Sequence, residues 1–116
     1  MFDAAKNAGT RIDLPLSETV SLSMIWCPPG DFMMGSLESD IYAQKSEFPR
    51  HRVTITKGFW FSCTLITQEQ WFCVMQQRIP LFDEGINLPV EGITWKEGIS
   101  FCEALTQFLK AKDILK

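Results

Sequence analysis

The stretch SLSMIWCPPGDFMMGS, residues 21–36, sets two short apolar runs on either side of a proline pair. Residues 21–26 alternate between polar and apolar and then run apolar, which is typical of a strand. The strand should end at the prolines, because proline cannot donate a backbone hydrogen bond to a neighbouring strand. The apolar pattern resumes after Gly30. The stretch therefore predicts two short strands joined by a tight turn over residues 28–30.

The second of these strands carries residues that we expect to pack in the core. Gly30 should provide a positive φ in the turn. Phe32 and Met34 lie two residues apart, so they share one face of the strand, and we expect them to anchor a sheet on which a helix packs. Met33 then faces the other layer. Met33 and Met34 are also soft metal ligands in principle, but their alternation on a strand favours packing.

The segment after this strand is predicted to be a long surface loop. Residues 35–50 are polar, contain Pro49 and show neither the helix period nor the strand period. Residues 51–62, HRVTITKGFWFS, alternate and then pass through Gly58 into an aromatic run, which predicts two further strands or one bent strand. Because the connections are too short for crossover helices, the sheet should be antiparallel.

Two helices are predicted from their start signals. Thr67 and Gln70 stand three residues apart, and Thr94 and Glu97 repeat this spacing, which is that of a capping box. The helices should therefore begin near residues 68 and 95. Between them, residues 78–92 contain two prolines and two glycines and should be irregular.

The second helix shows an apolar stripe at steps of three or four residues, which must pack on another element. If nothing covered it, the stripe would promote association. It consists of Trp95, Ile99, Cys102, Leu105 and Leu109, widened by Phe101 and Phe108.

Length and composition indicate one globular domain. The chain has 116 residues, of which 46% are hydrophobic and 22% charged. A net charge of −3 and the lack of a basic run argue against nucleic-acid binding. No segment has the apolar length of a signal peptide or a membrane span, so we expect a cytoplasmic protein without a membrane partner. Residues 1–20 are expected to be a polar arm, and residues 21–116 the domain.

The four cysteines do not form a recognisable metal site. Cys27, Cys63, Cys73 and Cys102 are widely separated and include no C-x-x-C pair. Buried free thiols are the expected state. A disulfide and a reactive thiolate are the alternatives, although no cation lies beside Cys27 or Cys102 in the sequence.

The other polar and aromatic candidates have structural interpretations beside the functional ones. His51 is expected to be a structural or surface histidine, because a general base needs a positioned partner and no nucleophile is evident. The loop carboxylates Glu38, Asp40 and Glu47 match no calcium-binding pattern, so we expect a solvated face. The aromatic run at 59–61 could stack on a ligand, but a strand would turn its first and third rings toward the core.

Four segments, in this order, resemble the formylglycine-generating enzyme family, also called the sulfatase-modifying factor family: MIWCPPGDFMMGS, EFPRHRV, LITQEQW and LPVEGITWKEGISFC. The resemblance covers about residues 24–105. It implies an α+β fold of the C-type-lectin-like kind, with short antiparallel strands, two helices and much irregular loop. The residues that carry the family motifs are Gly30, Phe32, Met34, Gly35, Glu47, Pro49, His51, Val53, Thr67, Trp71, Pro89, Val90, Trp95 and Cys102.

The resemblance also implies cofactors for which we find no ligands in this sequence. In the family, copper is held by cysteines and calcium by oxygen ligands, in segments that follow the second helix. The sequence ends at Lys116 before such segments, so we expect an incomplete domain and assign it no catalytic, cofactor-binding or metal residue. It also departs from the family pattern at Leu65, where glutamate is usual, and at Gly98, where alanine is usual.

Three functional hypotheses follow. The favoured one is the amino-terminal part of a formylglycine-generating-type domain that is not catalytic alone. The second is a free-standing, non-catalytic binding module. The third is an oxidase that converts a substrate cysteine to formylglycine with a copper-binding half from another chain. The expected partner is a complementary carboxy-terminal segment, or a second copy bound through the second helix.

Overall fold

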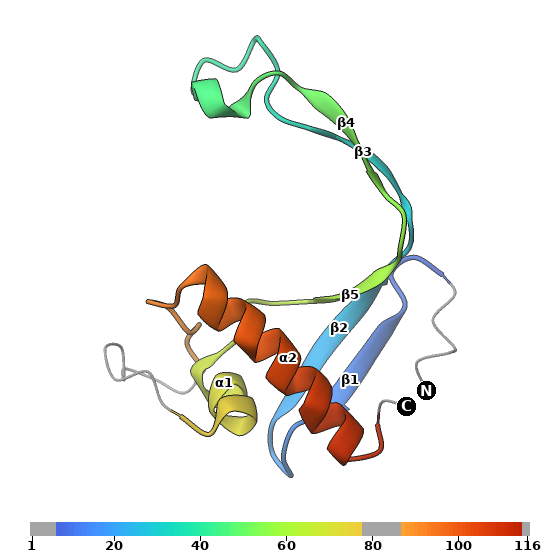
Figure 1. Ribbon diagram of the computed structural model, residues 1–116, viewed down its shortest axis with the longest axis vertical. Helices are drawn as coiled ribbons and strands as arrows, with labels where there is room; N and C mark the ends of the chain where they lie inside the picture. Colours follow the sequence, from blue (N-terminus) through green and yellow to red (C-terminus); the bar gives the residue numbers. More distant parts are fainter. Residues whose placement is uncertain (1–6, 78–86, 115–116) are drawn as a thin grey trace.

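Five short strands and two helices are built from the residues that the computed structural model describes, 7–77 and 87–114 (Figure 1). The architecture is α+β, as the sequence predicts. In chain order the elements are β1 (Arg11–Pro15), β2 (Ser21–Cys27), β3 (Gly30–Met34), a 3-10 turn (Lys45–Glu47), β4 (His51–Ile55), β5 (Phe59–Ser62), α1 (Gln68–Met75) and α2 (Trp95–Ala111).

The strands form a long antiparallel ribbon that is bent in the middle. β2 pairs with β1 on one side and with β5 on the other, and β3 pairs with β4. The last pair before the bend is Cys27↔Phe59, and the first pair after it is Gly30↔Ile55. Residues 28–29, between β2 and β3, therefore lie opposite residues 56–58, between β4 and β5. The one extra residue on the second side acts as a β-bulge, which bends a ribbon and increases its twist.

A glycine allows close packing at the bend. A Cβ atom on Gly58 would lie 2.3 Å from Cζ2 of Trp26, so no larger residue fits beside this ring without displacing it. Trp26 in turn meets Trp60 edge-on, with ring centroids 5.3 Å apart. Beyond the bend, β3 and β4 leave the body of the molecule as a projecting arm, defined here as residues 30–55 (Figure 1).

The bend replaces the tight turn that the sequence predicts over residues 28–30. That prediction is wrong, because β2 and β3 do not pair with each other and the chain continues along the ribbon from one to the other (Figure 1). The positive φ expected at Gly30 occurs instead at Gly35, where φ is 113°. A Cβ atom there would come within 2.7 Å of the Glu47 carbonyl oxygen, so the position requires glycine.

The core lies where the two helices cover one face of the three-stranded sheet (Figure 1). Trp71 of α1 and Phe101 of α2 stack with ring centroids 4.9 Å apart and planes 10° apart. Gln70 Nε2 donates to the Ser21 carbonyl oxygen at 2.9 Å, which satisfies this buried amide and ties α1 to the sheet. The buried hydrophobic residues are Leu14, Leu16, Leu22, Trp71, Phe101, Leu105 and Leu109.

Residues 11–16 contribute to this core, which corrects the polar arm predicted over residues 1–20. β1 pairs with β2 in a register that sets Leu14 opposite Leu22. Leu14 and Leu16 are buried, whereas the polar residues between the apolar ones are mostly exposed. The apolar side chains are few but share one face, and one face is all that an antiparallel edge strand must bury.

Both helices begin where the sequence predicts, α1 at Gln68 and α2 at Trp95. Each has a complete capping box. The N-cap threonine accepts a hydrogen bond from the backbone of the third helical residue, whose side chain accepts one in return from the N-cap backbone.

The predicted apolar stripe of α2 divides into a buried part and an exposed part. Phe101, Leu105 and Leu109 are buried against the body. The side chains of the stripe that lie nearer the start of α2 are exposed in the described part of the chain. The exposed part consists of Trp95, at 79% exposure, with Ile99 and Cys102.

Two predictions of irregular structure can be compared with the described residues. Residues 35–50 form the predicted surface loop, whose only regular piece is the 3-10 turn. Of the irregular segment predicted over residues 78–92, positions 78–86 lie outside the described residues. The rest is irregular apart from a single bridge between Thr67 and Pro89.

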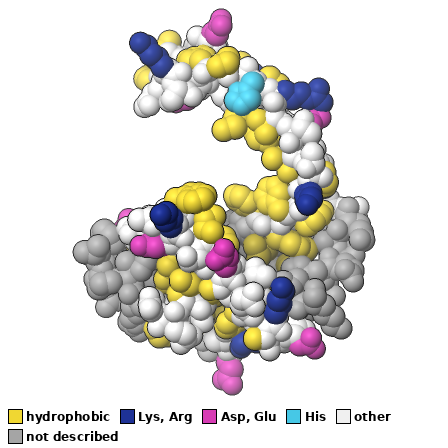
Figure 2. Space-filling view, in the orientation of Figure 1, with side chains coloured by type: hydrophobic (Ala, Val, Ile, Leu, Met, Phe, Trp, Pro, Cys, Tyr) yellow, Lys and Arg dark blue, Asp and Glu magenta, His cyan; other side chains and the backbone are white. Residues whose placement is uncertain are grey.

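The arm gives the molecule an open, arched shape. Its radius of gyration is 17.1 Å, against about 13 Å for a compact domain of this length. Figure 2 shows hydrophobic side chains gathered along the concave side of the arch. A large part of the apolar surface therefore lies outside the core.

Candidate functional site

The arm has one apolar face and one polar face. On the apolar face, Phe32 lies opposite Val53 and Met34 lies opposite His51. Phe32 is 49% exposed and Met34 53%, because no other layer packs on this two-stranded sheet among the described residues. The prediction that these two residues anchor the core is therefore wrong. Met33, predicted to face another layer, is as exposed as they are.

The polar face is held by a cross-strand network around Asp31. The Arg52 guanidinium donates to one carboxylate oxygen of Asp31, and the Thr54 hydroxyl donates to the other at 2.7 Å. The hydrogen bond from Arg52, followed by that from Thr54, lowers the pKa of Asp31 below its ordinary value. The network fixes the register of β3 against β4.

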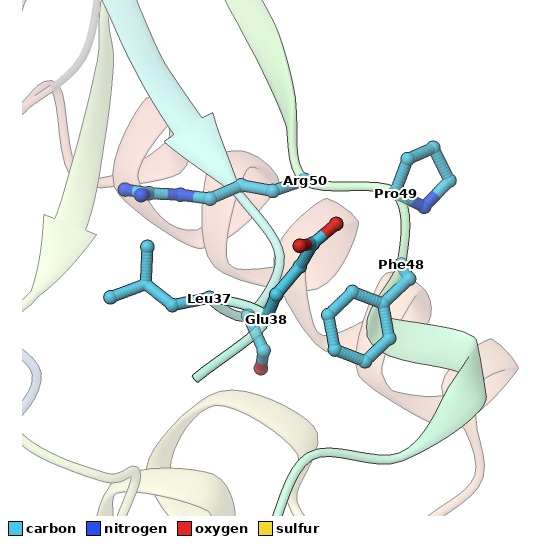
Figure 3. A pocket seen from close by; sticks show the side chains of 6 residues that line it. Leu37, Glu38, Phe48, Pro49 and Arg50 are labelled. Carbon is cyan, nitrogen blue, oxygen red and sulfur yellow. The ribbon is translucent and has the colours of Figure 1, made fainter. Parts of the chain in front are cut away.

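The loop at the end of the arm lines an open hollow of about 540 Å³ (Figure 3). The Arg50 guanidinium and the Glu38 carboxylate line it, and neither forms a hydrogen bond or ion pair with a described residue. Because nearly all its lining side chains are exposed, the hollow offers charges but little enclosure. The lining residues are Ser36, Leu37, Glu38, Phe48, Pro49 and Arg50.

Two of the loop carboxylates accept hydrogen bonds from other residues of the same loop. Asp40 Oδ1 accepts a hydrogen bond from the Tyr42 backbone N–H at 2.9 Å, and the Ser36 hydroxyl donates to the Glu47 carboxylate. Such contacts stabilise turns. They give these two carboxylates a structural role.

His51 also makes a local contact. Its Nδ1 lies 2.9 Å from the Pro49 carbonyl oxygen. A carbonyl oxygen can only accept, so Nδ1 carries the hydrogen and donates it. His51 is exposed at the start of β4, which agrees with the expected surface histidine.

The cysteines lie on four different parts of the fold, and the expectation of buried thiols is wrong. Cys63 and Cys102 are exposed, whereas Cys27 and Cys73 are half-buried, and all four are free thiols. Within residues 7–77 and 87–114, no group of three or more histidine, cysteine or acidic side chains could hold a metal ion. No helix in the same ranges is long and apolar enough to cross a membrane.

The family-motif residues of the body have structural positions. Thr67 caps α1 and forms the bridge to Pro89. The Val90 backbone N–H donates to the Ile66 carbonyl oxygen at 2.8 Å, which joins the segment before α2 to the start of α1. Trp71 supplies the stacked ring of the core. Trp95 and Cys102 are motif residues too, but they lie on the exposed side of α2.

These features define a small α+β domain, in which a bent antiparallel ribbon carries two capped helices on one face of its inner half. The sequence profile of the sulfatase-modifying factor enzyme 1-like domain matches residues 15–109. The chain therefore belongs to the sulfatase-modifying factor family, as the sequence motifs indicate. Comparison with curated proteins gives no significant match.

A solved structure shares the fold. PvdO from Pseudomonas aeruginosa superposes with a TM-score of 0.70 at 20% sequence identity. The match covers 89% of this chain but 45% of PvdO, so the present chain spans less than half the length of that protein.

The charge pattern around β4 is a feature that the family motifs do not include. Residues 48–68 contain Arg50, Arg52 and Lys57 and no acidic residue. This pattern can be read in the sequence. The structure places Arg52 within β4 and Arg50 immediately before it.

Proposed function

We propose that this chain is the amino-terminal, non-catalytic part of a formylglycine-generating-type domain, and that it acts as a scaffold that binds a second polypeptide. The observation that carries the proposal is the uncovered arm. A two-stranded ribbon is marginally stable alone in water and normally needs a third strand or a packed layer. Here the apolar face of the arm, with Phe32 and Met34, is left about half exposed.

A second uncovered surface supports the same proposal. Trp95 and Ile99, on the first turns of α2, are exposed large hydrophobic residues. Monomeric proteins rarely leave contiguous apolar patches of more than a few hundred Å² open. A partner that covered the concave side of the arch would bury apolar groups on the arm and on α2 together.

The comparison with PvdO indicates how large such a partner would be. The fold match leaves more than half of the PvdO chain without a counterpart here. A complementary segment of similar size, supplied by another polypeptide, would complete the domain. This is the partner we propose.

The positions of the thiols support a non-catalytic role. Copper(I) needs soft ligands that converge on one point, and within residues 7–77 and 87–114 the cysteines join no group of three or more metal-ligating side chains. Free thiols also suit a reducing compartment, so we place the scaffold in the cytoplasm.

Family membership favours one alternative function. If the second polypeptide brings the copper-binding cysteines, the assembled pair would oxidise a substrate cysteine to formylglycine with dioxygen. In that case the present chain would supply the supporting half of an active site that it does not contain.

Sedimentation velocity over a wide concentration range, with thermal unfolding on the same samples, tests the scaffold proposal. Because the isolated chain leaves its apolar faces open, we expect its copies to associate with one another as the concentration rises. This self-association should weaken in Phe32→Asn. Ile41→Asn, at an 85% exposed position on the loop, is the matched control and should change nothing. A sharply unfolding monomer at every concentration would contradict the proposal.

A direct assay distinguishes the non-catalytic scaffold from the oxidase. The chain is incubated with a cysteine-containing peptide, copper and oxygen, and the peptide is analysed by mass spectrometry for the aldehyde. The scaffold proposal expects no aldehyde from this chain alone. Aldehyde formed by the purified chain would overturn the non-catalytic assignment.

A further inference from the structure

We infer that the free edge of β4 binds an extended polypeptide segment in which apolar and acidic residues alternate, and that this segment adds to the arm as a third strand. The inference rests on the proposed scaffold function and specifies the chemistry of the partner. It follows from the pairing, the surroundings and the charge of β4.

The pairing leaves β4 open on one side. Among the described residues, β4 pairs only with β3, in the register that sets Phe32 opposite Val53. An open edge presents unpaired backbone N–H and C=O groups and is a template for another strand. Adding a strand would turn a marginal two-stranded ribbon into a three-stranded sheet.

The surroundings favour the β4 edge over the β3 edge. The β3 side leads into the proline pair at 28–29, which has no N–H to donate, and then into β2, whose outer side is already occupied by β1. The β4 side continues through residues 56–58 into β5, which is itself an edge strand. In the part of the chain that the structure describes, no strand therefore blocks a segment beside β4 where the arm meets the body.

The charge of β4 and of the residues that flank it selects the partner. Arg50, Arg52 and Lys57 lie in a stretch without acidic residues, in a chain whose net charge is −3. Arg52 is paired with Asp31, but Arg50 and Lys57 form no ion pair with a described residue. Acidic side chains beside them would be attracted. A second copy of β4 would bring like charges together, so we favour a different polypeptide.

The two faces of the arm set the pattern within the added strand. Side chains alternate between faces along a strand, so every second residue of the partner would continue the apolar face of Phe32 and Val53. The residues between them would lie on the face of Arg52 and Thr54. An apolar–acidic alternation matches both faces.

The test uses a fluorescently labelled synthetic peptide of alternating valine and glutamate, long enough to lie beside residues 50–57, and its valine–lysine counterpart. Anisotropy gives the two affinities, and hydrogen exchange followed by NMR locates the protected amides. We expect the glutamate peptide to bind about tenfold more tightly than the lysine peptide, with slowed exchange in residues 51–55.

Charge reversal provides the decisive variant. Arg50→Glu with Lys57→Glu changes two exposed side chains that form no ion pair with a described residue, and it should invert the peptide preference. Lys110→Glu, an exposed position on α2, is the matched control and should keep the preference unchanged.

The outcomes separate this inference from the scaffold proposal. Equal affinity for the two peptides, protection outside the arm, or no inversion in the double variant would overturn the β4 inference. The charges would then serve only to keep other strands away. If the chain still associated through its apolar face, the scaffold proposal would stand without the β4 inference. A chain that bound neither peptide and stayed monomeric would contradict both.

Discussion

Removing one phenylalanine ring from the body should cost far more stability than removing one from the arm. Phe101 is 5% exposed and stacks on Trp71, so Phe101→Ala should cost about 3–5 kcal/mol, the usual range for a buried phenylalanine. Roughly 0.5–1.5 kcal/mol of this is expected from the stacked pair. Phe32 is about half exposed, so Phe32→Ala should cost about 1 kcal/mol, half of the transfer free energy of a fully buried ring.

Urea titration followed by tryptophan fluorescence measures both free energies of unfolding. A loss of about 3–5 kcal/mol approaches the whole stability of a small domain, so Phe101→Ala should be measured in a stabilising osmolyte that keeps it folded. Phe101→Leu keeps an apolar group and serves as the milder control. If Phe32→Ala cost as much as Phe101→Ala, the arm would be packed against the body in solution, and the reasoning from exposure would fail.

Three further predictions concern the bend, a helix cap and the arm. Gly58→Ala should destabilise the fold, because the added methyl group overlaps the Trp26 ring; unchanged urea midpoints would contradict this contact. Thr94→Ala should cost about 1 kcal/mol by the same titration, because the N-cap hydrogen bond of α2 is lost; no loss would mean that the cap is dispensable. The pKa of Asp31 is lowered in the folded arm, so its stabilising effect is present above the ordinary carboxyl pKa and is lost as pH falls through the lowered pKa. Carboxyl NMR titration should show the Asp31 pKa returning toward its ordinary value in Arg52→Gln, and an unchanged pKa would exclude Arg52 as the cause.

Local signals were sufficient to predict the helices and the strand directions. A capping box is a contact between residues three apart, so Thr67 and Thr94 announce the two helices without knowledge of the rest of the fold. Short connections likewise require antiparallel pairing. The family motifs added the fold type, which the profile match and the PvdO structure confirm.

Burial could not be predicted in the same way, because it depends on what covers a face. Phe32 and Met34 have the alternation of core residues, yet among the described residues nothing packs on the arm. Trp95 lies on the same helical stripe as Leu105, but the sheet reaches only the later turns of α2. Leu14 shows the opposite case, because a single buried face in a polar segment gives a weak periodic signal.

The unequal connection at the bend constrains how the length of this chain can change. Two residues on one strand face three on the other, and strand side chains alternate with a period of two. Deleting one residue from 56–58 would equalise the connection, remove the bulge and change the direction in which the arm leaves the body. Insertions in the loop at the tip of the arm have no such effect. Natural length variation in relatives that keep this ribbon should therefore concentrate at the tip and be scarce at the bend.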